Sequence, residues 1–161
     1  MKSRAYLMDW GLIAALTAFG IAMGHLEGVV VVYIREIMGI VPTPEQLGPG
    51  VLADLPGWLL ATEQTREAAT IIMLVTLALV AGRSARQSLG VFLYTFGVWD
   101  IIYYVALKVM IDWPASLATT DCLFLIPSPW YAPVWLPVSI SCVLIISGAK
   151  LMQVPLRQVE K

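Results

Sequence analysis

The sequence is poor in charge and in the residues that most often identify an enzyme. Charged residues make up 13% of its 161 positions, histidine occurs once, and cysteine occurs twice. A haem held by two histidines cannot be built from one such chain, and the Glu-x-x-His pairs of di-iron helical bundles are missing. Cys-x-x-Cys, Walker and dinucleotide-binding motifs and a Ser/His/Asp spacing are also missing. Phosphate-handling and standard hydrolase chemistries therefore have no support.

The low net charge and the two cysteines exclude further features. The net charge is -1, and no basic stripe that would neutralise phosphates is present, so nucleic acid is not an expected partner. Cys122 lies in an expected loop and Cys142 inside the last hydrophobic segment. A disulfide would need an unusual geometry, so both cysteines are expected to be small apolar residues of the interior.

The chain is rich in apolar residues. They make up 59% of the sequence and the mean hydropathy is +0.80, which predicts an integral membrane protein in contact with the lipid bilayer. About 20 helical residues cross the ~30 Å hydrocarbon layer. Four segments reach or approach that length, approximately 11–34, 62–82, 89–111 and 134–151. We therefore expect an all-α fold, a four-helix transmembrane bundle that makes a single domain over residues 1–161.

The basic residues predict how this bundle is oriented. With four passes, seven of the ten Lys and Arg residues fall on the side of the termini, namely Lys2, Arg4, Arg83, Arg86, Lys150, Arg157 and Lys161. Because positive charge is enriched on the cytoplasmic side, both termini are expected in the cytoplasm, in a plasma membrane of the bacterial type. Two structured loops, approximately 36–61 and 112–133, are then expected outside.

Both outer loops contain proline and tryptophan. In the first, Gly50 to Ala61 has an apolar spacing that predicts a short surface helix. In the second, the prolines between Asp121 and Pro133 exclude a continuous helix, so this segment is either a rigid lid or an interfacial connection with aromatic anchors. Four tryptophans in or next to the loops indicate an interfacial aromatic belt: Trp58, Trp113, Trp130 and Trp135.

Ionisable residues in and beside the apolar segments indicate a functional site. A charge near the bilayer centre costs at least about 3 kcal/mol on insertion scales, so such side chains usually face the bundle interior and are paired. Asp100, Tyr104 and Lys108 recur at four-residue steps on one helical face. Lys108 is about 12 Å from Asp100 along the helix axis, so Asp100 needs a partner from another helix.

Two further helical faces carry charge. Glu63 and Glu67 form one stripe, and Arg66 lies beside it. On the first segment, His25 and Glu27 are offset by about 200°, so one of them must face away from a common centre. We expect catalytic acid and base roles for Asp100, Glu67 and Tyr104. Binding roles are expected for Glu63, Arg66, Glu27, Tyr103, Asp121 and Trp130.

Two alternatives exist for the same side chains. Carboxylate and imidazole ligands suit a single Zn, Fe or Mn ion, and the candidate metal ligands are His25, Glu63, Glu67 and Asp100. The other alternative is a network of ion pairs, in which Arg66 neutralises Glu63 and Glu67. In the same network Arg35 pairs with Glu36.

Gly20, Gly24 and Gly28 form the clearest packing motif. Small residues at four-residue intervals let another helix approach closely. The stripe serves either packing inside the bundle or contact with a second copy or a larger complex.

The leading functional hypothesis is a small membrane enzyme or ligand-binding protein. Its carboxylate and histidine site is expected between the first three helices near the outer leaflet, and its substrate is expected to be lipid-soluble and lipid-like. A second hypothesis is a non-catalytic subunit or assembly factor of a larger membrane complex. A third is a proton- or ion-translocating protein, which ranks lower because the inner halves of the helices have few polar groups.

Overall fold

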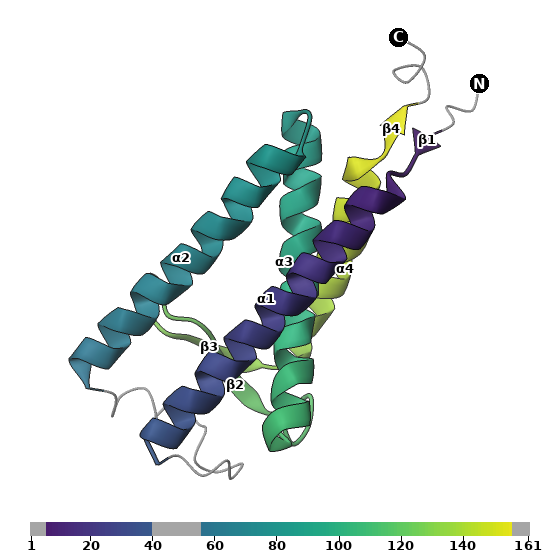
Figure 1. The fold of residues 1–161 in the computed structure, drawn as a ribbon. Helices are drawn as coiled ribbons and strands as arrows, with labels where there is room; N and C mark the ends of the chain where they lie inside the picture. The colour runs from purple at the N-terminus through teal and green to yellow at the C-terminus, as the bar shows by residue number, and fades with distance from the viewer. Residues whose placement is uncertain (1–5, 40–55, 156–161) are drawn as a thin grey trace.

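The structure, a computed structural model, describes residues 6–39 and 56–155. The described residues form four long helices side by side and two small antiparallel sheets (Figure 1). The helices are α1 (Trp10–Ile37), α2 (Gly57–Ala81), α3 (Ala85–Ile111) and α4 (Trp135–Met152). The strands β1 (Tyr6–Leu7) and β4 (Val154–Pro155) pair with each other, and β2 (Thr120–Phe124) pairs with β3 (Trp130–Pro133).

All four helices are long and apolar enough to cross a membrane, which confirms the predicted membrane-type helices. Their outer faces expose large apolar side chains, as lipid-facing positions require. Examples from the four helices are Leu26, Ile72, Val80, Val109 and Val143. Cys142 is also exposed, so the expectation of an interior position for this residue is wrong, although both cysteines are free thiols.

Capping side chains set where two helices begin. The Asp9 carboxylate accepts a hydrogen bond from the Leu12 amide at 3.0 Å, and the Ser84 hydroxyl accepts one from the Gln87 amide at 3.3 Å. Each satisfies a backbone donor that the first helical turn would leave unpaired. The Ser84 cap explains why α3 begins at Ala85, before the predicted start at residue 89.

The helix α2 also begins earlier than predicted, directly after Pro56. Proline is compatible with a helix start because its missing N–H has no partner there. Residues 57–61 are therefore the first turn of α2 and not part of a separate surface helix. Residues 40–55, which include most of the expected outer loop 36–61, lie outside the described residues.

The expected outer loop 112–133 contains a β-hairpin, which the sequence analysis did not predict. Asp121 lies opposite Ala132 and Cys122 lies opposite Tyr131, with an irregularity between Cys122 and Phe124. The segment between the strands contains Pro127 and Pro129, which lack the N–H that a helix or a strand ladder would use. The segment that follows β2 lies beside α2, where Leu125 is bonded to Gln64 and Glu67 (Figure 1).

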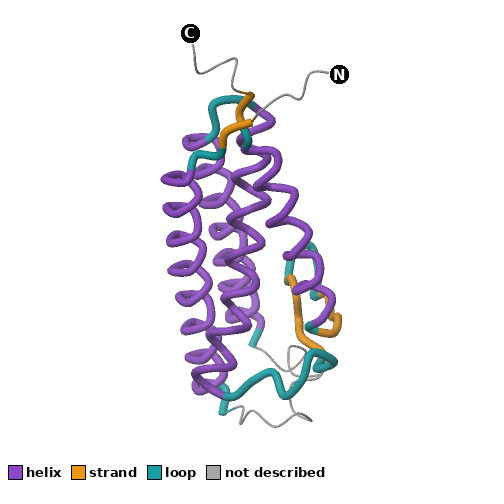
Figure 2. Tube along the Cα trace, turned by 90° about the vertical axis from the view of Figure 1, so that its right-hand side faces the viewer, coloured by secondary structure: helices purple, strands orange, loops and turns teal. Residues whose placement is uncertain are grey.

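The central helix of the bundle is α3, which packs against the other three helices (Figures 1 and 2). The glycine stripe of α1 lies on it: a β-carbon at Gly24 would be 2.5 Å from the Trp99 carbonyl oxygen, and one at Gly20 would be 2.7 Å from Val98. The stripe is therefore occupied by packing inside the bundle. Two more glycines, Gly97 of α3 and Gly148 of α4, bring α3 and α4 equally close.

The two ends of the bundle differ. The β1–β4 pair joins the two terminal segments at one end, and the α2–α3 turn lies at that same end (Figure 1). The β2–β3 hairpin lies in the opposite half, next to the start of α2 and the end of α1 (Figure 1). Most of the buried ionisable side chains lie in this hairpin half, and they form the candidate site.

Candidate functional site

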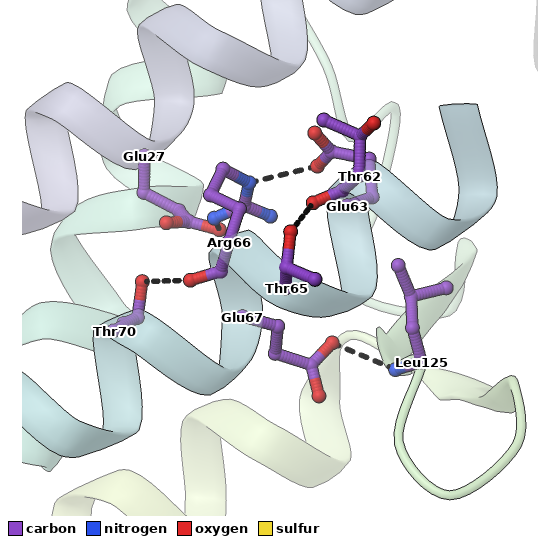
Figure 3. Close-up of polar contacts among 8 residues, drawn as sticks. All are labelled: Glu27, Thr62, Glu63, Thr65, Arg66, Glu67, Thr70 and Leu125. Carbon is purple, nitrogen blue, oxygen red and sulfur yellow. Dashed lines mark hydrogen bonds and ion pairs between the residues drawn. The ribbon is translucent and has the colours of Figure 1, made fainter. Parts of the chain in front are cut away.

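An arginine between two glutamates joins α1 to α2 (Figure 3). The Nε atom of Arg66 donates a hydrogen bond to Glu63 Oε2 at 2.8 Å. The Nη1 atom of the same guanidinium donates to the Glu27 carboxylate of α1. Glu63 precedes Arg66 by three residues, so the two share one helical face. Glu27 is the acidic residue of α1 that faces inward, whereas His25 is exposed. Of the two side chains that the offset of about 200° separates, Glu27 is therefore the one that faces the other helices.

A third glutamate joins α2 to the hairpin segment. Glu67 is buried, and its Oε2 accepts a hydrogen bond from the backbone N–H of Leu125 at 2.8 Å (Figure 3). The Gln64 amide donates to the Leu125 carbonyl at 3.2 Å. Both backbone groups of Leu125 are thus satisfied by side chains of α2. Among the described residues, no arginine or lysine forms an ion pair with Glu67.

The hairpin contributes a fourth carboxyl group, which faces α3. The Tyr104 hydroxyl donates to Asp121 Oδ2 at 3.1 Å, and both residues are buried. Burial raises the pKa of Asp121 to about 6, although the Arg35 charge and the Tyr104 hydrogen bond act to lower it. Asp121 is therefore able to take up or release a proton near neutral pH, as an acid or base must.

An arginine stacked on a tryptophan completes this part of the site. Arg35 is 8% exposed, and its guanidinium carbon lies 4.1 Å from the ring centre of Trp113, which is 2% exposed. The Nη1 atom of Arg35 and the Nε1 atom of Trp113 have no hydrogen-bond partner among the described residues. A buried donor without an acceptor costs about 1–3 kcal/mol, so both groups call for a partner.

Tyr103 connects the two halves of the site. Its hydroxyl is close enough to interact electrostatically with Asp121, Arg35, Glu27 and Arg66. Its ring packs edge-on against Tyr104, with ring centres 4.9 Å apart. The carboxyl groups from α1, α2 and the hairpin therefore belong to one region of the molecule.

Asp100 lies at the α4 side of this region, close enough for its charge to act on Asp121 and Tyr104. Its carboxylate accepts a hydrogen bond from the Ser141 hydroxyl of α4 at 2.8 Å, and Gly97 lets the Ser141 backbone approach α3 at that level. The expectation of a partner from another helix is confirmed. The partner, Ser141, comes from α4 and therefore lies outside the site expected between the first three helices.

Some of the other predicted site residues lie in this region and others do not. Of the predicted binding residues, Glu63, Arg66, Glu27, Tyr103 and Asp121 come together, whereas Trp130 is 51% exposed on the hairpin. The four candidate metal ligands are not gathered, since His25 points outward and Asp100 faces α4. No group of three or more His, Cys, Asp and Glu side chains within residues 6–39 and 56–155 is placed to hold a metal ion.

Sequence reasoning missed the roles of Arg35 and Trp113. Arg35 does not pair with Glu36, which is exposed, because adjacent residues on a helix do not face each other. Trp113 is a buried platform for Arg35, so its assignment to the interfacial belt is wrong. The helical spacing rule excluded the first pairing from the sequence alone. Nothing in the sequence placed Trp113 under Arg35, because they come from segments far apart in the chain.

Comparisons of the chain with protein-family models, with curated proteins and with solved structures give no match.

Proposed function

We propose that this protein binds a lipid-soluble molecule at the hairpin half of the bundle and acts on its polar head by acid–base chemistry. The observation that carries the proposal is the convergence of carboxyl groups from three separate elements. Glu27 comes from α1, Glu63 and Glu67 come from α2, and Asp121 comes from the hairpin. Packing alone does not require four buried carboxyl groups at one end of an apolar bundle.

The charge balance of this region supports acid–base work. Four carboxylates and two guanidinium groups, those of Arg35 and Arg66, leave two negative charges uncompensated when all are ionised. An apolar environment disfavours uncompensated charge and raises the proton affinity of carboxylates. Glu67 and Asp121 accept hydrogen bonds from neutral donors, the Leu125 N–H and the Tyr104 hydroxyl, and neither forms an ion pair among the described residues, so we assign the acid and base roles to them. Tyr104 positions Asp121.

A lipid-soluble ligand fits the surroundings of the site. The helices expose apolar side chains along their lengths, so a molecule dissolved in the bilayer meets the bundle from the side. The Phe96 ring contacts Trp99 edge-on and Phe124 face to face, with centre separations of 5.1 and 6.2 Å, and Phe124 precedes Leu125, whose amide is bonded to Glu67. Such a surface suits an apolar or aromatic portion of a ligand.

We further propose that the hairpin end faces the outer side of a plasma membrane and that the termini are cytoplasmic. Arg83 belongs to the turn between α2 and α3, Arg86 belongs to the first turn of α3, and Lys150 belongs to the last turn of α4. These basic residues lie at the end of the bundle that carries the β1–β4 pair, and positive charge favours the cytoplasmic side (Figure 1).

The experiment that tests the proposal identifies molecules that remain with the purified protein. Full-length protein is taken from its host membrane into lipid nanodiscs, and bound lipid-soluble compounds are extracted and identified by mass spectrometry. We expect one compound in near-stoichiometric amount, reduced about tenfold in Glu67→Gln, a loss that one hydrogen bond to a charged group can produce.

The matched control is Glu36→Gln, which makes the same chemical change on an exposed position of α1. It should retain the compound. Equal retention by wild type and Glu67→Gln, with both variants folded by circular dichroism, would contradict the proposal. So would wild-type protein that carries only bulk membrane lipids.

A further inference from the structure

The contact between Arg35 and Trp113 contains two hydrogen-bond donors that the proposed acid–base groups do not use. The guanidinium lies over the face of the indole, whereas the indole N–H points along the ring plane. The two groups therefore cannot satisfy each other. Both are more than nine-tenths buried, and neither donor has an acceptor among the described residues.

We propose that Arg35 and Trp113 bind a carbonyl oxygen on a neutral, planar head group of the lipid-soluble ligand. This inference rests on the proposed function and names the class of molecule that the site takes. An aryl ketone or a quinone has the required head. The ligand would supply the acceptor that both buried donors lack.

The charge of the surroundings selects a neutral acceptor over an anion. Asp121 lies close enough to Arg35 to interact with its charge, and Glu27 lies close enough to Tyr103 to interact with its hydroxyl. Glu63 and Glu67 in turn interact with Glu27. With Arg66 included, carboxyl groups outnumber guanidinium groups by two. A phosphate or carboxylate would add negative charge to a region that already has an excess, whereas a carbonyl oxygen accepts hydrogen bonds without adding charge.

The rings around the two donors favour a planar head. The Tyr104 and Trp113 rings lie 6.4 Å apart and are inclined by 33°, and Tyr103 packs edge-on against Tyr104. Aromatic side chains with these separations offer both faces and edges to another ring. Asp121 receives the Tyr104 hydrogen bond beside them, so a carbonyl bound here would have a proton-exchanging group at hand.

The test uses three probes that differ only at the head: dodecanophenone, which has a carbonyl oxygen, dodecylbenzene, which has none, and para-dodecylbenzoate, which is anionic. Each is titrated into full-length protein in nanodiscs, and binding is followed by calorimetry. We expect dodecanophenone to bind at least about tenfold more tightly than the other two, the effect of one or two hydrogen bonds to buried donors.

The variant Trp113→Phe removes the indole N–H and keeps an aromatic ring beneath Arg35. It should weaken dodecanophenone about tenfold and leave dodecylbenzene unchanged. Trp130→Phe is the matched control, because it makes the same change on an exposed tryptophan of the hairpin. If Trp113→Phe does not fold, nuclear magnetic resonance of the wild-type protein tests the same inference. The indole N–H resonance of Trp113 should shift when dodecanophenone is added and should not shift when dodecylbenzene is added.

Three results would overturn the inference. They are equal affinities for dodecanophenone and dodecylbenzene, preference for the anionic probe, and an unmoved Trp113 resonance, which would leave water as the partner of the two donors. A failure here is distinguishable from a failure of the proposed function. If only the carbonyl inference is wrong, the extract of wild-type protein still contains a bound compound of another class, and the extract of Glu67→Gln contains less of it.

Discussion

At the residue scale, the site combines two kinds of carboxyl group. Glu27 and Glu63 both pair with Arg66. Glu67 and Asp121 receive hydrogen bonds from neutral groups, the Leu125 amide and the Tyr104 hydroxyl. The first pair links α1 to α2 through Arg66, and the second pair is the one to which we assign the proposed acid and base roles.

Removing the central cation should be costly. Arg66→Gln leaves the largely buried side chains of Glu27 and Glu63 without their partner, and breaking a buried ion pair from one side costs about 3 kcal/mol. We expect the free energy of unfolding in mixed detergent micelles to fall by about that amount. The double variant Glu27→Gln, Arg66→Gln should recover part of it. An effect no larger than that of Arg83→Gln, an exposed arginine, would contradict the structural role.

Asp121 should give stability a distinct pH dependence. Its pKa is about 6 in the folded protein, above the usual value of 3.8 for this side chain, so the folded state holds a proton that the unfolded state has released. Stability contributed by this group is present below about pH 4, falls as pH rises from about 4 to 6, and stays lower above that. Two pK units correspond to about 3 kcal/mol.

Infrared spectroscopy and Asp121→Asn check this dependence. The absorption of a protonated carboxyl group should disappear with a midpoint near pH 6 in wild type, and that component should be missing in the variant. Between pH 4 and 7 the variant should lose less stability than wild type. Identical titrations of the two proteins would show that Asp121 is not the group concerned.

At the element scale, the helices were the predictable part of the molecule and the partners of the polar residues were not. Long apolar runs predicted all four helices, because spanning length is a property of the local sequence. The partner of Asp100 was not predictable, because Ser141 is one of several serines in α4 and only the register of α3 against α4 selects it. The hairpin was missed because its prolines excluded a helix without specifying a sheet.

The same distinction applies within the candidate site. The spacing of Glu63, Arg66 and Glu67 predicted a polar face on α2, and the structure has these residues in one region. Which of His25 and Glu27 faces inward depends on how α1 rotates against α3. The rotation is set by the glycine stripe, whose partner helix the sequence did not identify.

Close packing at that stripe gives a prediction. An alanine at Gly24 would place its β-carbon 2.5 Å from the Trp99 carbonyl oxygen, so α1 would have to move off α3. We expect Gly24→Ala to lower the free energy of unfolding by about 1–3 kcal/mol, the usual cost of overpacking. Gly57→Ala is the control, since no atom outside its own neighbourhood lies within 4 Å of the added β-carbon. Equal effects of the two changes would contradict the α1–α3 packing.

At the scale of the whole molecule, both described terminal segments lie at one end and the candidate site lies in the opposite half. Antiparallel pairing of β1 with β4 fixes the first relationship. All four helices are long and apolar enough to cross a membrane, so in the proposed arrangement the site and the termini lie on opposite sides of the bilayer. The proposed orientation makes the site the outer one.

Thiol labelling checks this orientation. The background protein carries Cys122→Ser and Cys142→Ser. A single cysteine is then introduced at Ala85, the first residue of α3, or at Ala115, which precedes the hairpin; both positions are exposed. We expect a membrane-impermeant maleimide added to intact cells to label Ala115→Cys and to spare Ala85→Cys until the membrane is permeabilised. The reverse pattern would place the termini outside.

The glycines also determine where the bundle can open. Close backbone contact fastens α3 to α1 and to α4, and the β1–β4 pair fastens the ends of α1 and α4. No glycine follows Gly57 in α2, which contacts α1 through side chains: the Arg66 ion pair with Glu27 and the apolar contact of Leu74 with Met23. We therefore expect a hydrophobic molecule that diffuses in the plane of the bilayer to enter beside α2, where the bundle separates without breaking a close backbone contact and the charged pair has to open.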